Sequence, residues 1–521
     1  MDWFSTSLTP KFINSLPKLP NDSKVITRFP PAPSGCLHIG HLKALILNQS
    51  LAKKYNGKCL FRIDNTNPDI DSLEFEKMII EDVKSLGFEF DHFSHTSDHF
   101  DALLVHAENL IKLGLAYLDD TPVEELKLMR TNMQISKNRN LPIEVHLDLF
   151  RERFIRGTLP NFCLRLKIDM NNPNYVLRDP VIYRYMKSIN STSKYSVFPT
   201  YDFACPLIDS IEKVTHCLRT TEYDSRDPLY HWILEKCNLS KITIMEFSKL
   251  NIEDTILSKR KLKELIDSGK VSGWDDPRLP TIRGLLARGV TVPAMIKFVA
   301  DQGFSKKCGV VSLDKLLSFN KQDIDLKVPR FTCLEQNVVL HLENINPIDL
   351  PIIVSKHPKS NINLGYKSIG CTFQPNQTSI DLLIDLEDSL WLLEGTEFTL
   401  IYWGNCIVTN VKLFNNGLRE IWVNHHPVGD PKLTDIKLTW LISNSNNIKG
   451  KIYKYYSLLV ENNFQEIDII MEPSIIDVPA NSAIQFMRKG FYFRKFTNDP
   501  NEFIWIETID FPKKVKFPPL C

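Results

Sequence analysis

The sequence predicts an α/β protein with a parallel sheet first, a helical portion next and antiparallel β-barrels in the last third. Three observations along the 521 residues predict this fold class. Extended and helical segments alternate from Lys24 to about Gly114, which is typical of strands joined by crossover helices. Helical periodicity dominates 258–319. After about residue 328, short β-rich runs recur between turns, which is typical of antiparallel barrels.

The first part of the chain contains the alternating segments. In chain order they are Val25–Phe29, Leu42–Tyr55, Cys59–Asp64, Leu73–Leu86 and Phe100–Leu113. In parallel sheets of this kind, ligands bind outside the carboxyl ends of the strands. We therefore expect a binding crevice near Asp64 and near the turn that follows Phe29.

We interpret residues 121–200 as an insertion into this α/β domain. Thr121-Pro122-Val123-Glu124 has the pattern of a capping box with proline at the first helical position, which predicts a helix start. The stretch that follows is more charged and less regular, and the α/β pattern resumes at Tyr201. The expected parts are a tail at 1–23, a Rossmann-like domain at 24–120 and 201–257, and the insertion at 121–200.

Helical and then β-rich patterns follow. Helical periodicity predicts a helical subdomain at 258–327. The strands expected beyond it are Val338–Leu342, Ile380–Leu386, Phe398–Trp403, Ile407–Leu413, Glu420–Val423, Lys451–Leu459, Ile467–Met471, Ile484–Met487, Gly490–Phe493 and Phe503–Glu507. Their spacing between Asn, Pro and Gly turns predicts one or two antiparallel barrels over 328–521.

Net charge, cysteine pattern and the absence of long apolar runs limit the classes of protein to which the chain can belong. The net charge is +1, so any surface for a polyanion must be a local patch. The eleven cysteines include no C-x-x-C pair, which argues against a disulfide framework or a zinc finger and favours a reducing compartment. No apolar run approaches the roughly 20 residues that a membrane span needs. The N-terminus lacks the apolar stretch of a secretory signal, so a cytoplasmic enzyme is expected.

The most informative stretch is Pro33-Ser34-Gly35-Cys36-Leu37-His38-Ile39-Gly40-His41. It joins a predicted strand to a predicted helix, and it places two imidazoles one turn apart at the junction. Backbone N–H groups and the helix dipole at such a junction attract phosphate, and histidines add donors for developing charge. The alternative is an ordinary helix start with buried, hydrogen-bonded histidines.

A second phosphate-facing element is Ile256-Leu257-Ser258-Lys259-Arg260-Lys261. Ser258 has the character of an N-cap, and three cations then stand at the positive end of a helix, where the macrodipole disfavours them. An anion bound there would make them favourable. The alternative is a solvated basic helix start.

Together these two elements resemble the signatures of class I aminoacyl-tRNA synthetases. Further stretches resemble the glutamyl-tRNA synthetase family of the eukaryotic and archaeal type: Arg28–Gly35, Ile63–Pro68, Asp119–Pro122, Val176–Val181, Pro199–Ala204, Leu218–Tyr223 and Gly273–Arg278. The resemblance runs from about Lys24 to Ser305. Asn65 stands where family members usually have an acidic residue, Ala32 where they often have Glu, and Ile256 replaces the first lysine of the mobile loop.

The resemblance implies a glutamate–tRNA ligase for protein translation. Glutamate and ATP would give glutamyl-adenylate, and the glutamyl group would pass to the terminal adenosine of tRNA(Glu). The fold implied is a class I synthetase domain with an acceptor-stem insertion, a mobile loop with a helical subdomain, and anticodon-binding barrels. ATP would bring Mg²⁺, and neither a tightly bound cofactor nor a protein metal site is expected. Association with other synthetases cannot be read from the sequence.

The same resemblance implies roles for individual residues. His38, His41 and Lys259 would be catalytic, by stabilising phosphate charge and the leaving pyrophosphate. The residues implied in ATP binding are Pro33, His38, Gly40, His41, Leu257, Ser258, Lys259 and Arg260.

Glutamate needs cations for two carboxylates and an anion for its ammonium group. Arg28 lies at the end of the first predicted strand, and Arg219 ends a predicted strand at Thr215–Arg219, so we expect both to serve the carboxylates, with Arg219 at the side chain. Asp64 is expected to meet the ammonium group. The remaining residues expected at the glutamate site are Ser34, Tyr201 and Cys205.

Each alternative function predicts a sequence feature that would distinguish it from a glutamate–tRNA ligase. A glutaminyl-tRNA synthetase shares the fold, but it usually lacks the Arg219-Thr220-Thr221-Glu222-Tyr223 pattern. A non-catalytic tRNA-binding paralogue would be expected to have lost His41 or Lys259, and both are present. A shortened glutamyl-transferase would lack the C-terminal barrels. We therefore favour glutamate as the substrate.

Overall fold

The computed structural model describes residues 8–68, 72–186, 194–345, 351–370, 377–414, 419–444 and 446–510. The chain divides into two compact units. Unit 1 comprises Met1–Lys270, Pro280–Arg283 and Ile296–Ser312, and unit 2 comprises Val271–Leu279, Gly284–Met295 and Leu313–Cys521. Each unit is described by itself.

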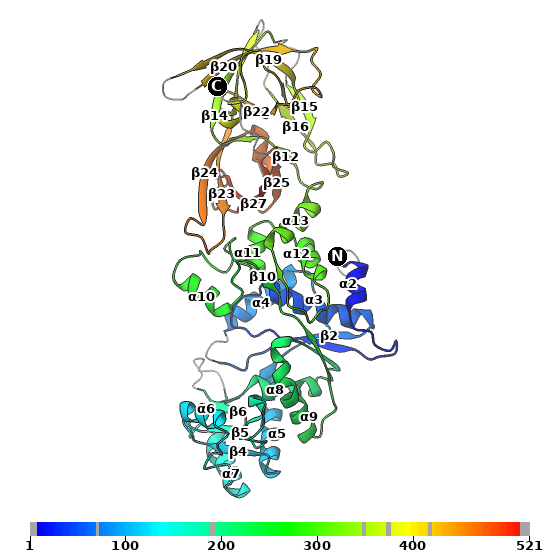
Figure 1. Cartoon of the computed structure of the whole chain (residues 1–521), viewed down its shortest axis with the longest axis vertical. Coiled ribbons are helices and arrows are strands. Elements are labelled where there is room, and N and C mark those ends of the chain that lie inside the picture. The colour runs from blue at the N-terminus through cyan, green and yellow to red at the C-terminus, as the bar shows by residue number, and fades with distance from the viewer. Residues whose placement is uncertain are drawn as a thin grey trace. The chain divides into compact units, whose positions relative to one another are not determined.

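A parallel sheet lies at the centre of unit 1 (Figure 1). Strands β1 (Ile26–Phe29), β2 (Lys58–Ile63) and β3 (His92–His95) pair in parallel in that order. Strands β8 (His216–Thr220) and β9 (Thr243–Phe247) form a second parallel pair. The Thr215 N–H donates to the Ile26 carbonyl at 2.9 Å, so β8 adjoins β1. The carboxyl ends of these strands therefore lie at one edge, as predicted for a ligand crevice.

Helices connect and cover these strands. They are α3 (Ile39–Lys54), α4 (Leu73–Ser85), α5 (Phe100–Lys112), α8 (Tyr201–Ile211) and α9 (Asp227–Lys236), with 3₁₀ turns at Thr96–His99 and Thr221–Arg226. Later parts of the chain add β10 (Asn251–Ile252), which pairs with β11 (Val310–Val311), and α10 (Lys259–Asp267). The helices α11 (Ile282–Ala287) and α12 (Val292–Asp301) each have residues assigned to both units. Apolar residues of β1, β2, α8, β8 and α9 form a buried core under the crevice.

Residues 116–199 contain a separate four-stranded sheet within unit 1. Strands β4 (Ala116–Asp119), β5 (Cys163–Leu166), β6 (Val181–Tyr185) and β7 (Val197–Pro199) pair antiparallel. They are accompanied by α6 (Val123–Thr131), α7 (Ile143–Leu149), a π-helical turn at Phe150–Phe154 and a 3₁₀ turn at Tyr175–Leu177. Strand β4 belongs to this sheet although it ends before residue 121.

The predicted capping box at the start of α6 is wrong. The helix begins at Val123, close to the predicted start, but Pro122 precedes it and no side chain caps it. The Thr121 hydroxyl instead donates to the Asp119 carboxylate at 2.7 Å. The Asp119 carboxylate is buried and charged, so it is a strong acceptor for the Thr121 hydroxyl. That hydroxyl is therefore oriented to Asp119 and does not cap the start of α6.

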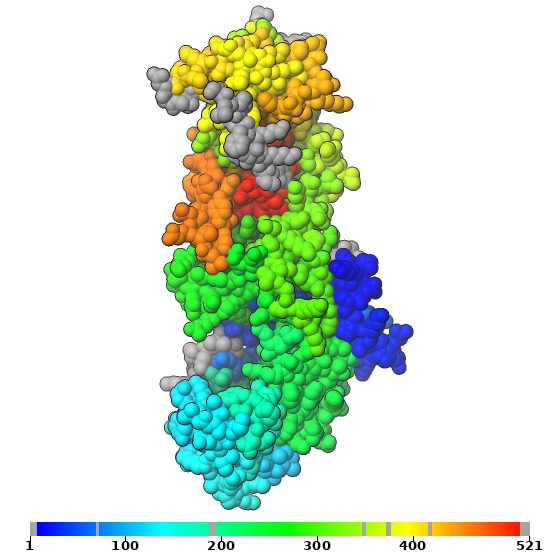
Figure 2. All heavy atoms as spheres, viewed as in Figure 1, coloured from blue at the N-terminus to red at the C-terminus, as the bar shows by residue number. Residues whose placement is uncertain are grey.

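The N-terminal segment packs against unit 1 from residue 8 onward. A short helix, α2 (Pro10–Ser15), buries Phe12 beneath it. The Lys54 ammonium group donates to the carbonyls of Ile13 and Leu16, at 3.2 and 3.3 Å. The Phe304 N–H donates to Ser15 Oγ at 3.0 Å. Figure 2 shows this segment, in dark blue, lying along the surface of the same unit.

Unit 2 contains two seven-stranded sheets among its described residues. The first has the order β12 (Arg330–Phe331), β25 (Ala483–Phe486), β26 (Gly490–Arg494), β27 (Ile504–Asp510), β23 (Ile448–Tyr455), β24 (Phe464–Met471) and β13 (Cys333–Leu334). The second has the order β21 (Lys437–Leu438), β18 (Glu397–Leu400), β19 (Gly404–Leu413), β20 (Arg419–His426), β14 (Asn337–Glu343), β17 (Ser379–Asp385) and β22 (Trp440–Ile442).

Each of these sheets curls around an apolar core, so unit 2 has two nearly closed, barrel-like sheets. Unit 2 also contains α13 (Leu313–Ile324), α14 (Leu386–Ser389), a 3₁₀ turn at Pro473–Asp477 and the antiparallel pair β15 (Ile352–Ser355) and β16 (Tyr366–Ile369). The pairing is not purely antiparallel, since β14 pairs with β20 and β23 pairs with β27 in parallel. Long connections between these strands permit parallel pairing, which short hairpins do not. None of the helices in the described ranges is long and apolar enough to span a membrane.

Candidate active site

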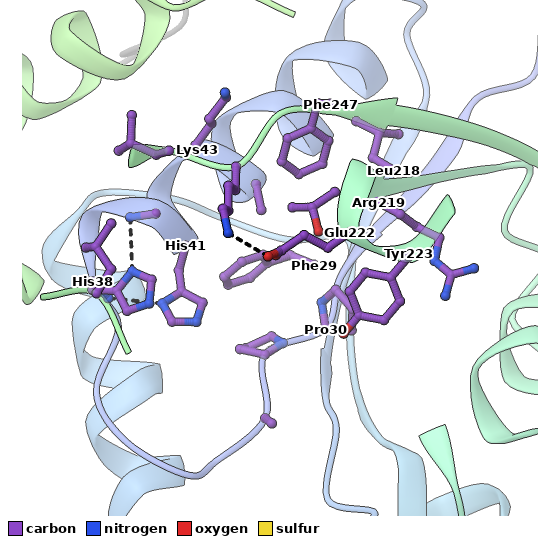
Figure 3. Close-up of a pocket in the computed structure, with 18 of the residues that line it drawn as sticks. Phe29, Pro30, His38, His41, Lys43, Leu218, Arg219, Glu222, Tyr223 and Phe247 are labelled. Carbon is purple, nitrogen blue, oxygen red and sulfur yellow. Dashed lines mark hydrogen bonds and ion pairs between the residues drawn. The ribbon is translucent and has the colours of Figure 1, made fainter. Parts of the chain in front are cut away.

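A cavity of about 790 Å³ opens at the carboxyl ends of β1 and β8 in unit 1 (Figure 3). Most of the residues predicted for the site line it: Arg28, Ser34, His38, Gly40, His41, Asp64, Tyr201, Arg219, Leu257, Ser258 and Lys259. Residues from β1, α3, β8 and the start of α10 thus meet around one cavity. Of the other predicted residues, Pro33, Cys205 and Arg260 are not among its lining.

His38 and His41 cap helix α3 reciprocally. His38 is the N-cap residue, and its Nδ1 accepts the Gly40 N–H at 3.1 Å. The His41 Nδ1 accepts the His38 N–H, also at 3.1 Å. The two ring centroids are 3.8 Å apart. Two histidines therefore perform what a serine and a glutamate perform in an ordinary capping box.

This arrangement determines the protonation of both rings. Burial lowers the pKa of His38 to about 3, and the charge of Lys259 adds to the effect. Burial also lowers the pKa of His41 well below its usual value, with contributions from His38 and Lys259. Both rings are therefore neutral at pH 7. Because each Nδ1 accepts a hydrogen bond, the single proton of each ring resides on Nε2, which is left as a donor.

Gly40 is required by the same geometry. A Cβ atom at this position would lie 2.8 Å from His38 Cε1 and 3.0 Å from His38 Nδ1. Any side chain would push the His38 ring away from the Gly40 N–H that it caps.

The turn at His38–His41, called the histidine turn below, is held in place by contacts with residues that we did not predict. The Leu37 N–H donates to Asp82 Oδ2 at 3.2 Å, and Arg283 Nε donates to Asp82 Oδ1 at 2.7 Å. Burial raises the pKa of Asp82 to about 6, against the opposing charge of Arg283. The Ile39 N–H donates to the Pro280 carbonyl at 3.1 Å. No short motif marks these partners, because they lie far from the turn in the sequence.

Lys259 reaches across the cavity to the loop that follows β1. Its ammonium group donates to the Ala32 carbonyl at 2.8 Å and lies 3.5 Å from Ser34 Oγ. Ser258 occupies the N-cap position of α10, as predicted, but its side chain makes no capping hydrogen bond. Arg260 turns away from the cavity, since its side chain is 89% exposed and pairs with Glu264 at 3.0 Å.

Arg219, at the end of β8, is nearly buried, with a side chain that is 3% exposed. Its Nη1 donates to Asp227 Oδ1 at 3.0 Å. The tyrosine rings that surround the guanidinium, with centroids 4.8 to 5.9 Å away, are those of Tyr223, Tyr230 and Tyr201. Its Nε is buried and has no hydrogen-bond partner within the described residues. The Nε atoms of Arg288, Arg330, Arg419 and Arg494 are also buried without a partner, but of these arginines Arg219 lines the cavity, where an anionic acceptor can reach its N–H.

Arg28 is directed to a buried carboxylate. Its Nε lies 3.1 Å from both oxygens of Asp209, and its Nη1 donates to the Leu218 carbonyl at 3.2 Å. Burial favours a neutral Asp209, but Arg28 and Arg62 overcome this effect and lower its pKa to about 2. Arg28 thus lines the cavity with a charge that Asp209 already compensates. Sequence reasoning missed Asp209, whose distance of 181 residues from Arg28 leaves no local signal.

The remaining predicted residues surround these two arginines. The Thr96 hydroxyl lies 3.5 Å from Asp64 Oδ1, and burial raises the pKa of Asp64. The rings of Tyr201 and Tyr223 have centroids 5.6 Å apart. Cys205, one helical turn after Tyr201, is buried, and its Sγ lies 3.5 Å from Arg28 Nη2.

Three charged residues in the lining were not predicted for the site. The Lys249 ammonium group pairs with Glu222 at 2.7 Å, as the dashed line in Figure 3 shows. Lys43 is buried, and its Nζ donates to the Ser248 carbonyl at 2.6 Å. Burial lowers the pKa of Lys43 to about 8. Lys43 lies on the helix that the two histidines begin, and Glu222 is part of the Arg219–Tyr223 pattern, so helix position and motif could have indicated them.

A possible metal-ligating group within the described ranges consists of Asp224, Asp227 and Glu246. Arg219 pairs with Asp227, and Lys306 pairs with Glu246 at 2.5 Å. Two of the three carboxylates therefore already have a cation.

Comparisons with known proteins show what the whole chain is similar to. A family model described as the catalytic domain of class I tRNA synthetases (E and Q) matches residues 24–326. The chain is 42% identical over 506 residues to a probable cytoplasmic glutamate–tRNA ligase of Enterocytozoon bieneusi, covering 93% of this chain and 78% of that protein.

More distant relatives carry related names. The chain is 39% identical over 496 residues to a probable cytoplasmic glutamate–tRNA ligase of Schizosaccharomyces pombe, covering 90% of this chain and 68% of that protein. It is 38% identical over 493 residues to a bifunctional glutamate/proline–tRNA ligase of Mus musculus, covering 90% of this chain and 32% of that protein.

Proposed function

The chain belongs to the family of class I tRNA synthetases for E and Q, and we propose that it is a glutamate–tRNA ligase that works in the cytoplasm. It activates L-glutamate with ATP and transfers the glutamyl group to tRNA(Glu). The observation that carries the proposal is a single cavity lined by His38, His41 and Lys259 as well as by the buried, incompletely paired Arg219.

We assign the glutamate end of the cavity to Arg219, Asp64 and Tyr201, with Ser34 beside them. Arg219 binds the side-chain carboxylate, because a guanidinium can hold a carboxylate bidentately. Asp64 meets the ammonium group. Arg28 and Cys205, which contact each other, are assigned to the same end of the cavity. The grip on the carboxylate comes chiefly from Arg219, because Asp209 already occupies the Nε of Arg28, whereas Asp227 contacts Nη1 of Arg219 and leaves its Nε without a partner among the described residues.

The ATP end consists of the histidine turn and the start of α10, with Pro33, Gly40 and Leu257 assigned to it through the family. Arg260 is left out of this assignment, because its side chain turns away from the cavity. Attack of the glutamate α-carboxylate on the α-phosphorus releases pyrophosphate, so negative charge moves onto the phosphate oxygens. The Nε2–H groups of His38 and His41 are neutral donors that stabilise this charge without reorganising. Lys259 stabilises the leaving pyrophosphate. Mg²⁺ arrives with ATP, held mostly by phosphate and water oxygens.

The second step needs no side-chain nucleophile. A ribose hydroxyl of the terminal adenosine attacks the carbonyl carbon of the adenylate, and AMP leaves. Positioning of the two reactants supplies most of the rate. We propose that the insertion meets the acceptor stem and that the sheets of unit 2 read the anticodon, whose unpaired bases offer faces for stacking and edges for hydrogen bonds.

Amino-acid selectivity follows from Arg219. A glutamine amide in place of the carboxylate would leave a buried guanidinium without an anion, and sites built on such pairing discriminate by about 10⁴ or more. Aminoacylation of total tRNA with labelled glutamate and glutamine tests the assignment. We expect the wild-type protein to charge glutamate alone, and Arg219→Ala to lose most of the preference.

The matched control for this assay is Arg226→Ala, because Arg226 pairs with Asp202 near the cavity without lining it. This variant keeps the preference for glutamate. Charging with glutamine by the wild-type protein, or an unchanged preference in Arg219→Ala, would contradict the assignment.

A further inference from the structure

The guanidinium of Arg219 is held on one side and unpartnered on another. Its Nη1 donates to Asp227 Oδ1 at 3.0 Å, while its Nε is buried and has no hydrogen-bond partner among the described residues. A guanidinium presents a bidentate edge through Nε and the neighbouring Nη2. The contact with Asp227 uses the other amino nitrogen, so this edge is not consumed by the protein's own carboxylate.

The first turn of α9 supplies the contacts that hold the guanidinium. Asp227 is its first residue, where the helix dipole favours a negative charge. Tyr230 follows three residues later on the same face, with its ring centroid 5.4 Å from the Arg219 guanidinium carbon. The Tyr230 hydroxyl donates to Asp209 Oδ2 at 2.9 Å, so the ring is itself anchored. The guanidinium is therefore held at Nη1 and packed against a fixed aromatic ring.

We infer that Asp227 is a positioning residue that holds Arg219 at Nη1 and turns its Nε edge to the side-chain carboxylate of glutamate. The inference rests on the proposed function. Asp227 does not touch the substrate, and it determines selectivity through the orientation of Arg219. Without this contact the long side chain regains rotational freedom, which has to be lost again whenever glutamate binds.

A competing effect of Asp227 must be separated from positioning. Its negative charge also reduces the attraction of Arg219 for an anion, so removal of that charge alone would favour glutamate binding. Asp227→Asn distinguishes the two effects, because the amide oxygen can still accept from Nη1 while the charge is gone. Asp227→Ala removes both the charge and the hydrogen bond.

The test is ATP–pyrophosphate exchange in the presence of tRNA, with glutamate and with glutamine, for the wild-type protein and both variants. We expect Asp227→Ala to raise the KM for glutamate by roughly 10-fold or more and to change kcat much less, because a hydrogen bond between charged groups is lost. Its preference for glutamate over glutamine falls by a similar factor. Asp227→Asn restores the KM to the wild-type value or below it.

Asp224→Ala is the matched control. Asp224 is an exposed carboxylate close to Asp227 and Glu246, and its removal takes the same charge from the same neighbourhood without touching Arg219. We expect wild-type kinetics from it. Melting temperatures of all variants establish that each is folded.

Three results would overturn the inference. A lower KM in both Asp227 variants would show that Asp227 only competes with the substrate. An unchanged KM in Asp227→Ala would show that it has no positioning role, and an equal fall in kcat in both variants would show a general structural role. Absence of glutamate exchange in the wild-type protein would instead contradict the proposed function.

Discussion

Each of the two histidines at the start of α3 uses its two ring nitrogens for different purposes. One nitrogen accepts a backbone N–H of the helix start, and the other carries the proton. The backbone thus determines the tautomer, and burial keeps the ring neutral. A neutral donor fixed in this way suits the developing charge on phosphate, because it needs no change of protonation before it acts.

His41→Ala removes one of these donors and one capping acceptor. We expect turnover in ATP–pyrophosphate exchange to fall by roughly 10² to 10³, the usual consequence of losing one preorganised donor. His106→Ala, which changes a half-buried histidine of α5 outside the cavity lining, should leave turnover unchanged. A loss of less than about threefold in His41→Ala would exclude a role in the chemical step.

The depressed pKa of His38 makes folding stability depend on pH. The pKa is about 3 in the folded state, against a usual value of 6.5. Between these values the unfolded chain binds the proton and the folded protein does not, so stability falls as the pH drops from 6.5 towards 3. His38→Gln, which can still accept the Gly40 N–H, should lose stability less steeply than the wild-type protein over pH 7 to 4.5. Urea unfolding at several pH values measures this difference, and equal slopes would contradict it.

At the scale of single elements, α3 begins earlier than the apolar pattern indicates. The pattern predicts a helix from Leu42, and the structure begins it at Ile39. The reason is the reciprocal capping by His38 and His41, which includes the histidines and the intervening glycine in the first turn. Gly40 therefore belongs to the capping geometry as well as to the cavity lining.

Gly40→Ala tests this view of the first turn. The new methyl group would lie within 3.0 Å of the His38 ring, so the ring must leave its capping position. We expect turnover to fall by roughly 10-fold to 10³-fold, because a displaced donor is lost from the transition state. Gly309→Ala is the control, since a Cβ there meets no atom within 4 Å. Equal activity of the two variants would contradict the account of α3.

The start of α10 provides the second prediction at this scale. Lys259→Ala removes the cation that contacts the loop after β1, and we expect adenylate formation to slow by roughly 10² to 10³ with little change in the KM for glutamate. Lys261→Ala, an exposed lysine of the same turn, should have little effect. A large loss of glutamate binding with normal adenylate formation would exclude the proposed role of Lys259.

At the scale of the whole molecule, the fold class could be predicted from the sequence, whereas the pairing of segments that are distant in the sequence could not. The parallel strands, the insertion and the β-rich end each have a local pattern. Strand β3, His92–His95, was missed because its polar residues lack the apolar run of a buried strand. Tertiary pairing with β2 over four residues outweighs that weak propensity.

The candidate site likewise combines residues that local motifs predict with residues that only the folded chain brings together. His38, His41 and Lys259 lie in short motifs, and the structure brings them to one cavity. Asp209 and Asp82 lie on α8 and α4 outside any recognisable motif, and their partners become neighbours only on folding. No local pattern can predict such partners, because their role depends on distances that the chain acquires through its topology.

The most direct test of the central claim is ATP–pyrophosphate exchange by the wild-type protein with glutamate and with glutamine, each with and without total tRNA. We expect exchange with glutamate and a rate with glutamine lower by about 10⁴ or more, because Arg219 requires a carboxylate. Exchange that prefers glutamine would move the chain to the glutaminyl enzymes and contradict the role of Arg219. No exchange under any of the four conditions would contradict the assignment as a ligase.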